Sequence, residues 1–87
     1  MIRVDRVTNG EVIFFLSGVI TTEDIPYLEQ LLSSESDGGK IALDLKDILH
    51  VNDAAVAFLS RCETAGIVLR NCPAFIRDWM QIQKGRQ

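Results

Sequence analysis

The sequence predicts an α/β fold: a single small domain with a mixed, mostly parallel four-stranded sheet and three helices, in the order ββαβαβα. Three observations support this prediction. The 87 residues suffice for one hydrophobic core. An Asn9-Gly10 pair separates two apolar segments, which is typical of a β-hairpin. Two later strand patterns are each followed by a helical pattern, and right-handed crossovers make such strands parallel. We expect the domain to occupy residues 1–83 and residues 84–87 to form a frayed tail.

The predicted hairpin contains the first two strands. Residues 2–7 alternate apolar and polar side chains, as a half-buried strand at a sheet edge does. Because Asn-Gly favours the positive φ angles of a tight turn, residues 11–17 should return antiparallel. Residues 12–16 are apolar on both faces, which indicates a place inside the sheet. Gly18 is expected to end this strand.

The first helix and the third strand follow. Pro26 lacks an N–H and fits only a first helical turn, so the N-cap should be one of residues 22–24. The turn-forming residues 36–39 should end this helix. Residues 40–45 then give the clearest strand pattern, that of a central parallel strand, and Asp47 is expected in the polar loop after it. The apolar stripe of the helix comprises Ile25, Leu28, Leu31 and Leu32.

The second helix is expected to begin at Asn52 or Asp53 and to extend through Glu63. A projection at about 100° per residue places Val56 and Ala57 on the polar arc, beside Ser60, Arg61, Glu63 and Thr64. We therefore expect Val56 to face solvent, and a Val56→Asp substitution to leave stability nearly unchanged. The arc predicted to face the core holds Ala54, Ala55, Phe58, Leu59, Cys62 and Ala65.

The last strand and helix complete the pattern. Gly66 should close the second helix before a short apolar strand, residues 67–69. Pro73 lies where a first helical turn tolerates it. One apolar face is predicted for the final helix, made of Phe75, Ile76, Trp79 and Ile82.

Composition excludes several classes of function. A net charge of −3 and a pI of about 4.9 argue against nucleic-acid binding. No apolar run reaches the roughly 20 residues of a membrane helix, and the N-terminus lacks a signal-peptide core, so we expect a cytoplasmic protein without membrane insertion. Cys62, Cys72 and His50 do not form a metal motif, and the cysteines are expected to be buried free thiols. With no catalytic triad, HExxH motif or nucleotide fingerprint, we predict neither an enzyme nor a cofactor.

Two segments together resemble STAS domains, the family of anti-sigma-factor antagonists and their relatives. Residues 41–59 read IALDLKDILHVNDAAVAFL and resemble the signature segment of that family. Residues 65–73, AGIVLRNCP, resemble the glycine, strand and Asn-x-Pro sequence before its last helix. The resemblance covers nearly the whole chain and implies a non-catalytic regulatory module that binds another protein.

The resemblance also implies that a common regulatory switch is absent. In the family an aspartate precedes two hydroxyl residues, and a partner kinase phosphorylates the second. Here Asp53 is present, but Ala54 and Ala55 occupy the hydroxyl positions, and an alanine cannot hold a phosphoryl group. The family position, Ala55, is therefore not a phosphorylation site, and Ser60 or Thr64 stay open as other hydroxyl targets.

The start of the second helix is the candidate partner-binding site, because a helix N-terminus presents unpaired N–H donors and a partial positive charge. The partner implied by the resemblance is an anti-sigma-like kinase or a transporter subunit. Asp53 could instead be only a structural cap. Other open readings are a small-ligand module that senses a nucleotide or lipid, an auxiliary subunit of a membrane transport system, and a homodimer formed through exposed edges. The predicted partner-binding residues are Asn52, Asp53, Ala54, Ala55, Val56, Ala57 and Ser60.

Overall fold

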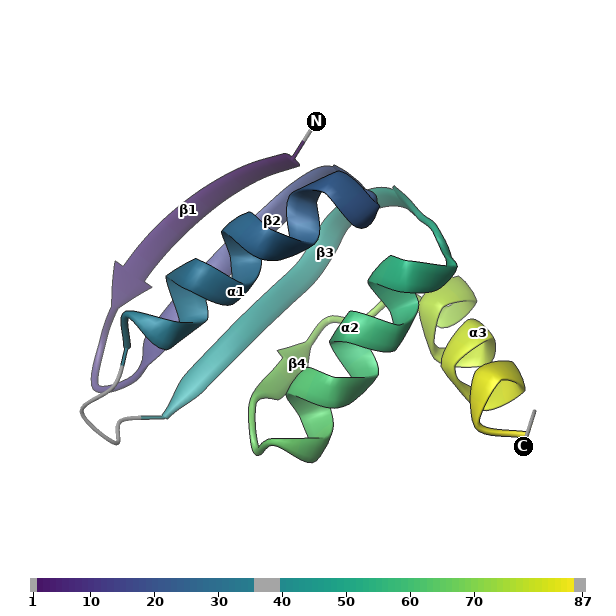
Figure 1. Ribbon diagram of the computed structural model, residues 1–87. Coiled ribbons are helices and arrows are strands. Elements are labelled where there is room, and N and C mark those ends of the chain that lie inside the picture. Colours follow the sequence, from purple (N-terminus) through teal and green to yellow (C-terminus); the bar gives the residue numbers. More distant parts are fainter. Residues whose placement is uncertain (1, 36–39, 86–87) are drawn as a thin grey trace.

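The computed structural model describes residues 2–35 and 40–85, and its elements follow the predicted order ββαβαβα (Figure 1). The turn expected at residues 36–39 lies outside the described residues. A short 3₁₀ turn, η1, precedes the first α-helix. The elements are β1 (Ile2–Thr8), β2 (Val12–Ile20), η1 (Thr22–Asp24), α1 (Ile25–Ser33), β3 (Ile41–Val51), α2 (Asp53–Thr64), β4 (Val68–Arg70) and α3 (Ala74–Lys84).

The four strands form one mixed sheet in the order β1-β2-β3-β4. β1 pairs antiparallel with β2, whereas β2 with β3 and β3 with β4 pair in parallel, as predicted. Figure 1 shows α1 and α2 over the same face of the sheet, with α3 beside α2. The first and second crossovers, α1 and α2, therefore build one helical layer, and α3 extends it.

Glycines set two features of the sheet. Gly10, with φ of 76°, lies in the hairpin turn as expected, but Asn9 does not have the positive φ that was also expected, and because Thr8 pairs with Val12 the loop comprises residues 9–11. Gly18 has φ of 97° and lies at a register shift within β2, so it does not end the strand. The positive φ permits a bulge after which the ladder with β3 resumes as far as Ile20 and Val51. Consequently Asp47 lies in β3, paired with Ser17, and not in the predicted loop.

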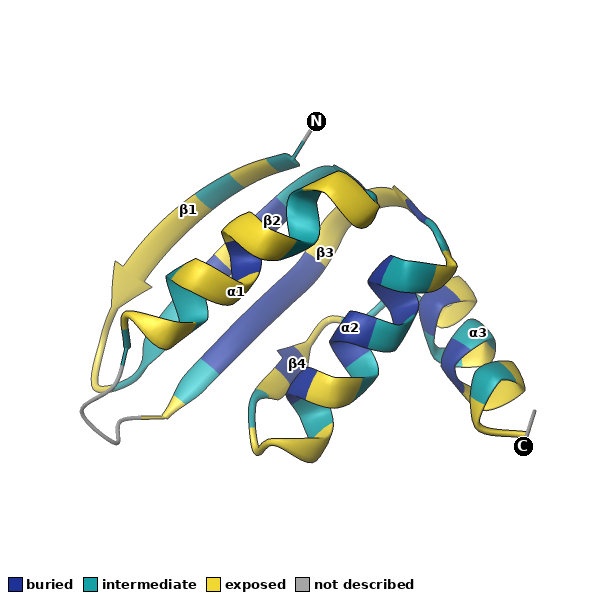
Figure 2. Cartoon of the chain, viewed as in Figure 1, coloured by how far each residue is buried: buried dark blue, intermediate teal, exposed yellow. Residues whose placement is uncertain are grey.

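The hydrophobic core lies between the sheet and the helical layer (Figure 2). Its sheet side includes Phe14 on β2 and Leu43 on β3, which are partners in the parallel ladder. Leu28 of α1 and Phe58 of α2 cover them. The enclosed space that these side chains line measures only about 10 Å³, about the room of one water molecule. The core is therefore packed without an internal ligand cavity at this place.

The first helix begins where the position of Pro26 led us to expect. Asp24 precedes α1 and is its N-cap residue, within the expected range 22–24, and Pro26 lies in the first turn. The Asp24 carboxylate accepts hydrogen bonds from the backbone N–H of Thr21 at 2.9 Å and from its hydroxyl at 3.2 Å. These contacts fix the path from β2 into the helical layer.

Candidate docking site at the start of helix α2

Asn52 joins the end of β3 to the start of α2. Its side-chain Oδ1 accepts a hydrogen bond from the Ala55 N–H at 2.9 Å, which makes Asn52 the N-cap. Its Nδ2 donates to the Thr22 hydroxyl at 3.1 Å, so the cap is tied to η1. One of the free helix N–H donors assumed from the sequence is thereby already occupied. Asn52 contributes to the site mainly by fixing the direction in which α2 starts.

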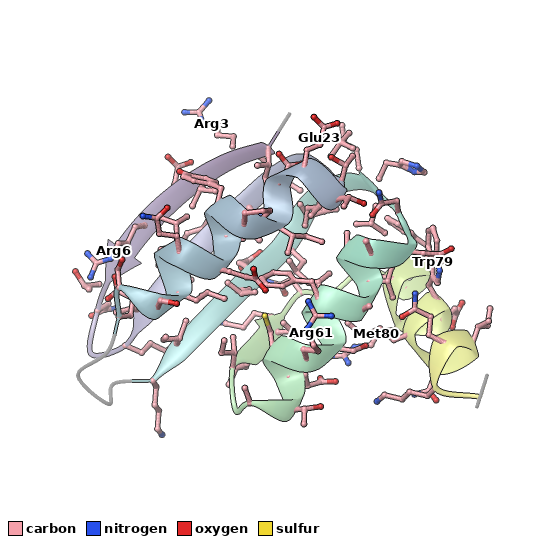
Figure 3. The ribbon with its side chains drawn as sticks, in the orientation of Figure 1. Arg3, Arg6, Glu23, Arg61, Trp79 and Met80 are labelled. Carbon is pink, nitrogen blue, oxygen red and sulfur yellow. The ribbon has the colours of Figure 1, made fainter. Side chains whose placement is uncertain are left out.

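Asp53, the first residue of α2, is exposed and connects α2 to α3. Its carboxylate Oδ1 accepts a hydrogen bond from Trp79 Nε1 at 2.8 Å. Its backbone carbonyl accepts another from Gln83 Nε2 at 3.0 Å. Figure 3 shows Trp79 on α3 beside the start of α2. A negative charge in the first turn of a helix is also favoured by the helix dipole. Asp53 therefore has a structural role in addition to the predicted place at the site.

Val56 contradicts the expectation that its side chain faces solvent, because it is 0% exposed. The reason is α3, which packs against this side of α2. Asp53, Val56 and Glu63 recur at helical spacing on one stripe, and each end of the stripe bonds to α3: Asp53 to Trp79, and Glu63 to Arg77 at 2.8 Å. A projection of α2 alone does not include a neighbouring helix. The prediction for Val56 was therefore wrong.

The other members of the predicted site divide into covered and accessible residues. Ala55 is fully buried, as its assignment to the core arc predicted, so its methyl cannot contact a partner. Ala54 and Ala57 are half-buried, and Ala57 is thus less exposed than expected. Asp53 is exposed. The accessible part of the predicted site is therefore Asp53 with the flanks of the two half-buried alanines.

The two hydroxyls that stayed open as modification sites have different surroundings. Ser60 Oγ is buried and has no hydrogen-bond partner among the residues that the structure describes. The Thr64 hydroxyl donates to the Ser60 carbonyl at 3.1 Å, and Thr64 is exposed at the end of α2. Thr64 is therefore the more accessible of the two in this conformation, and the Ser60 hydroxyl does not form part of the surface.

The outer face of α3 adds residues that the sequence reasoning did not assign to the site. Phe75 and Ile82 were predicted on one apolar face with Ile76 and Trp79, but they are 41% and 55% exposed. The core side of α3 is instead formed by Ile76, which was predicted, and by Met80 one turn later, which was not. Trp79 is half-buried between the two faces. Helical spacing alone suits both stripes, and only the position of α2 decides between them.

An open hollow connects this face of α3 with Asp53. Its volume is about 420 Å³. Three apolar side chains and two carboxylates line it, and we name it the Asp53–Trp79 surface: Asp53, Phe75, Asp78, Trp79 and Ile82. The missed members could have been found from the sequence by treating the final helix as having two apolar stripes, one for the core and one for a partner.

The cysteines have the chemistry of structural residues. Both are free; Cys62 is buried and Cys72 half-buried. Burial raises the pKa of the Cys62 thiol to about 11, and it also raises the pKa of Cys72. At neutral pH both side chains therefore stay protonated and weakly nucleophilic. Within residues 2–35 and 40–85, no three His, Cys, Asp or Glu side chains gather as metal ligands.

No helix in the described part of the chain combines the length and apolar character needed to cross a membrane.

Comparisons with known proteins identify the fold. No family model and no curated protein matches the chain. Among solved structures, the anti-sigma factor antagonist SpoIIAA in its unphosphorylated form is similar with a TM-score of 0.68 and 17% identity, over 97% of this chain and 81% of SpoIIAA. An uncharacterized DUF3478 protein with a SpoIIAA-like fold, from Shewanella loihica PV-4, has a TM-score of 0.56 and 18% identity, over 79% of this chain and 68% of that one.

A third similar structure is much longer than this chain. It is described as Mglu and matches with a TM-score of 0.62 and 18% identity. The match covers 83% of this chain but only 19% of Mglu, so the chain spans about a fifth of that protein. At such identities the likeness concerns the arrangement of strands and helices. On the strength of that arrangement, the chain has the STAS-like fold of the anti-sigma factor antagonist SpoIIAA, as its sequence predicted.

Proposed function

We propose that this chain is a non-catalytic regulatory module that binds a partner protein through the Asp53–Trp79 surface and the adjoining flanks of Ala54 and Ala57. One observation carries the proposal. Three apolar side chains of α3, two of them exposed, lie around a carboxylate at the start of α2. Aromatic and aliphatic groups with a polar rim are typical of protein interfaces. The fold of an anti-sigma factor antagonist supports the same class of function.

The charge of the surface suggests what the partner presents. Asp53 and Asp78 both line the hollow, and none of the basic residues that the structure describes does. A partner segment with an apolar side chain for the hollow and a Lys or Arg for the two carboxylates would be complementary. An anti-sigma-like kinase and a subunit of a membrane transport system are the two partner classes we propose, and we place the interaction in the cytoplasm.

Binding is proposed to proceed without phosphorylation at the start of α2. Ala55 has no hydroxyl, and its side chain is fully buried beneath the helix start. The partner would therefore meet the same surface in every molecule of this protein. Regulation would then come from protein abundance, from the state of the partner, or from modification of the exposed Thr64.

A pair of matched substitutions tests the docking surface. Ile82 and Tyr27 are exposed to similar extents, 55% and 51%, but Tyr27 lies on α1 and outside the hollow. We expect Ile82→Glu to lose a protein that the wild-type chain and Tyr27→Glu both capture from native lysate, as measured by quantitative mass spectrometry. Equal capture by all three proteins would contradict the proposed surface. Thermal unfolding of each variant establishes that it is folded.

A small-ligand function is the second candidate that the sequence left open, although the hollow is wide and open to solvent, unlike the enclosed pockets that bury most of a ligand. In that case a nucleotide or a lipid would occupy the hollow and tune the association. A rise in the unfolding temperature upon addition of GTP, ATP or a fatty acid would support it. No rise with any of them, together with selective loss of a protein by Ile82→Glu, would favour the docking module.

A further inference from the structure

The sheet face opposite the helices carries two ordered rows of side chains that cross all four strands. Directly paired residues of adjacent strands point to the same face, so the ladder register defines each row. The first row is Val7, Ile13, Ala42 and Val68. The second row is Asp5, Phe15, Asp44 and Arg70. We call these eight residues the open sheet face.

The open sheet face is exposed at its two edges and at Phe15, whereas Ala42 and Asp44 on the central strand β3 are 0% and 7% exposed. Val7 and Val68, at the two ends of the first row, are 45% and 50% exposed, and Phe15 in the second row is 40% exposed. Figure 1 shows the helices gathered on the other side of the sheet. A sheet face with exposed large apolar side chains is a candidate surface for a partner.

We propose that a second copy of this chain covers the open sheet face, with the two sheets packed face to face about a two-fold axis that is parallel to the strands. This inference goes beyond the partner binding proposed for the Asp53–Trp79 surface and does not depend on it. The axis lies between the two sheets and reverses the strand order, so β1 of one copy lies over β4 of the other and β2 lies over β3. Each row then meets the same row of the second copy.

The first row is self-complementary under this axis. Val7 meets Val68 of the second copy, and Ile13 lies opposite the buried Ala42, so that its contacts are with the side chains that surround Ala42. The larger side chain of β2 therefore lies over the short side chain of β3, as the packing of two sheets requires. A two-fold axis perpendicular to the strands would instead place β2 on β2 and bring apolar residues of one row against charged residues of the other. The residue types in the two rows therefore favour the axis parallel to the strands.

The second row is complementary in charge. Asp5 at one end meets Arg70 of the second copy, and the symmetry repeats this pair at the other end. The two side chains are 62% and 45% exposed, so both can reorient. In the single chain Arg70 lies 3.1 Å from Glu11, and Asp5 lies 3.6 Å from Arg3. Exposed pairs of this kind are weak, so they do not prevent new pairing across an interface.

The central position of the second row can be covered without leaving a polar group unpaired. The Asp44 side chain, under Phe15 of the second copy, already has a hydrogen bond at each oxygen: Oδ1 accepts from the Lys46 N–H at 3.0 Å, and Oδ2 from Asn71 Nδ2 at 2.9 Å. Asp44 is 7% exposed in the single chain. Further burial therefore removes little water from this carboxylate.

The dimer should be weak and concentration-dependent. With four strands about 4.8 Å apart and two rows about 7 Å apart, the face amounts to roughly 270 Å² per copy. A standard interface contributes about 800 Å² per partner. Analytical ultracentrifugation over a wide range of protein concentrations is therefore the suitable measurement, and we expect the weight-average mass to rise from that of one chain towards that of two.

A charge exchange tests the proposed axis. Asp5→Arg places two arginines at each end of the dimer, and Arg70→Asp places two aspartates there, so each variant alone should dimerise at least about tenfold more weakly than the wild type. An equimolar mixture of the two variants restores opposite charges at both ends. We expect the mixture to form a heterodimer of about wild-type strength. Arg61→Asp, an exposed change on α2, should leave dimerisation unchanged.

The inference is overturned if the wild type has the mass of a single chain at every concentration, or if Asp5→Arg and Arg70→Asp both dimerise as strongly as the wild type. It is also overturned if the mixture of these two variants dimerises as weakly as each alone, or if Arg61→Asp weakens the dimer as much as they do. Because Arg70→Asp also brings a second carboxylate near Glu11, its folding is checked by thermal unfolding. If it does not fold, Phe15→Ser replaces it, with loss of the dimer expected and a persistent dimer counting against the inference. Loss of lysate capture by Ile82→Glu is a separate observation, so either proposal can fail alone.

Discussion

At the scale of single residues, the start of α2 combines a site that a partner can reach with residues that the fold requires. Asn52 caps the helix and Asp53 holds Trp79, whereas Val56 is part of the core. Local chemistry was sufficient to predict the cap and the start of the helix, because both depend on adjacent residues. The burial of Val56 depends on a helix that begins about twenty residues later in the chain, so no local pattern contains it.

The buried position of Val56 makes a charge there strongly destabilising. We expect Val56→Asp to lower the free energy of unfolding by about 3–5 kcal/mol, because the carboxylate would be placed in the core without a partner. Thr64→Asp, at the exposed last residue of the same helix, should lower it by no more than about 1 kcal/mol, the cost of a negative charge at a helix C-terminus. Urea denaturation of both variants measures the difference. Equal stability of Val56→Asp and the wild type would show that this side chain is not in the core.

The raised pKa of Cys62 predicts a loss of stability at alkaline pH. The folded thiol has a pKa of about 11, above the roughly 8.5 of an unfolded cysteine, so the folded state holds the proton more tightly. This contribution is complete below pH 8.5 and disappears as the pH rises through 11. The difference in unfolding free energy between the wild type and Cys62→Ala should therefore shrink across this interval. A difference that stays constant from pH 8 to pH 11 would contradict the assignment.

At the scale of the elements, the order and type of the strands and helices were predictable, and their lengths and contacts were less so. The hairpin follows from Asn9-Gly10, and the parallel strands follow from two strand-helix repeats. The extension of β2 beyond Gly18 was missed because a glycine with positive φ can either end a strand or form a bulge. The choice depends on whether β3 offers further partners, which is a property of the assembled sheet.

The hydrogen bond between Asp53 and Trp79 should hold α3 against the start of α2. We expect Asp53→Ala to lower the steady-state fluorescence anisotropy of Trp79, the only tryptophan of the chain, and to reduce the free energy of unfolding by about 0.5–1.5 kcal/mol. Asp78→Ala removes the same charge from the same surface and is the control. If the two variants have the same anisotropy, the hydrogen bond does not restrain the indole.

At the scale of the whole molecule, α3 belongs to the same core as the sheet. Ile76 and Met80 are buried in one cluster with Phe14 and Leu43. The sequence predicted a final helix with an apolar face, but it did not predict that the helix has a second apolar stripe open to solvent. The fold class was therefore predictable from the order of patterns, whereas the Asp53–Trp79 surface depends on how α2 and α3 meet.

This shared core predicts a single unfolding transition. Because α3 packs into the same cluster as the sheet, we expect Trp79 fluorescence and far-ultraviolet circular dichroism to give the same midpoint during denaturation. The fluorescence reports on α3, and the dichroism on all helices and strands. A fluorescence midpoint at lower denaturant concentration would mean that α3 separates first and forms an independent unit.

The enclosure of Ala55 has an evolutionary consequence. A change of this codon from alanine to serine would supply the residue type that kinases modify, but its hydroxyl would lie at a position without solvent exposure. The backbone N–H there is already bonded to Asn52, so the helix start cannot shift without loss of its cap. A serine at this position would therefore not be enough for phosphorylation, because the helix start would also have to become accessible to a kinase.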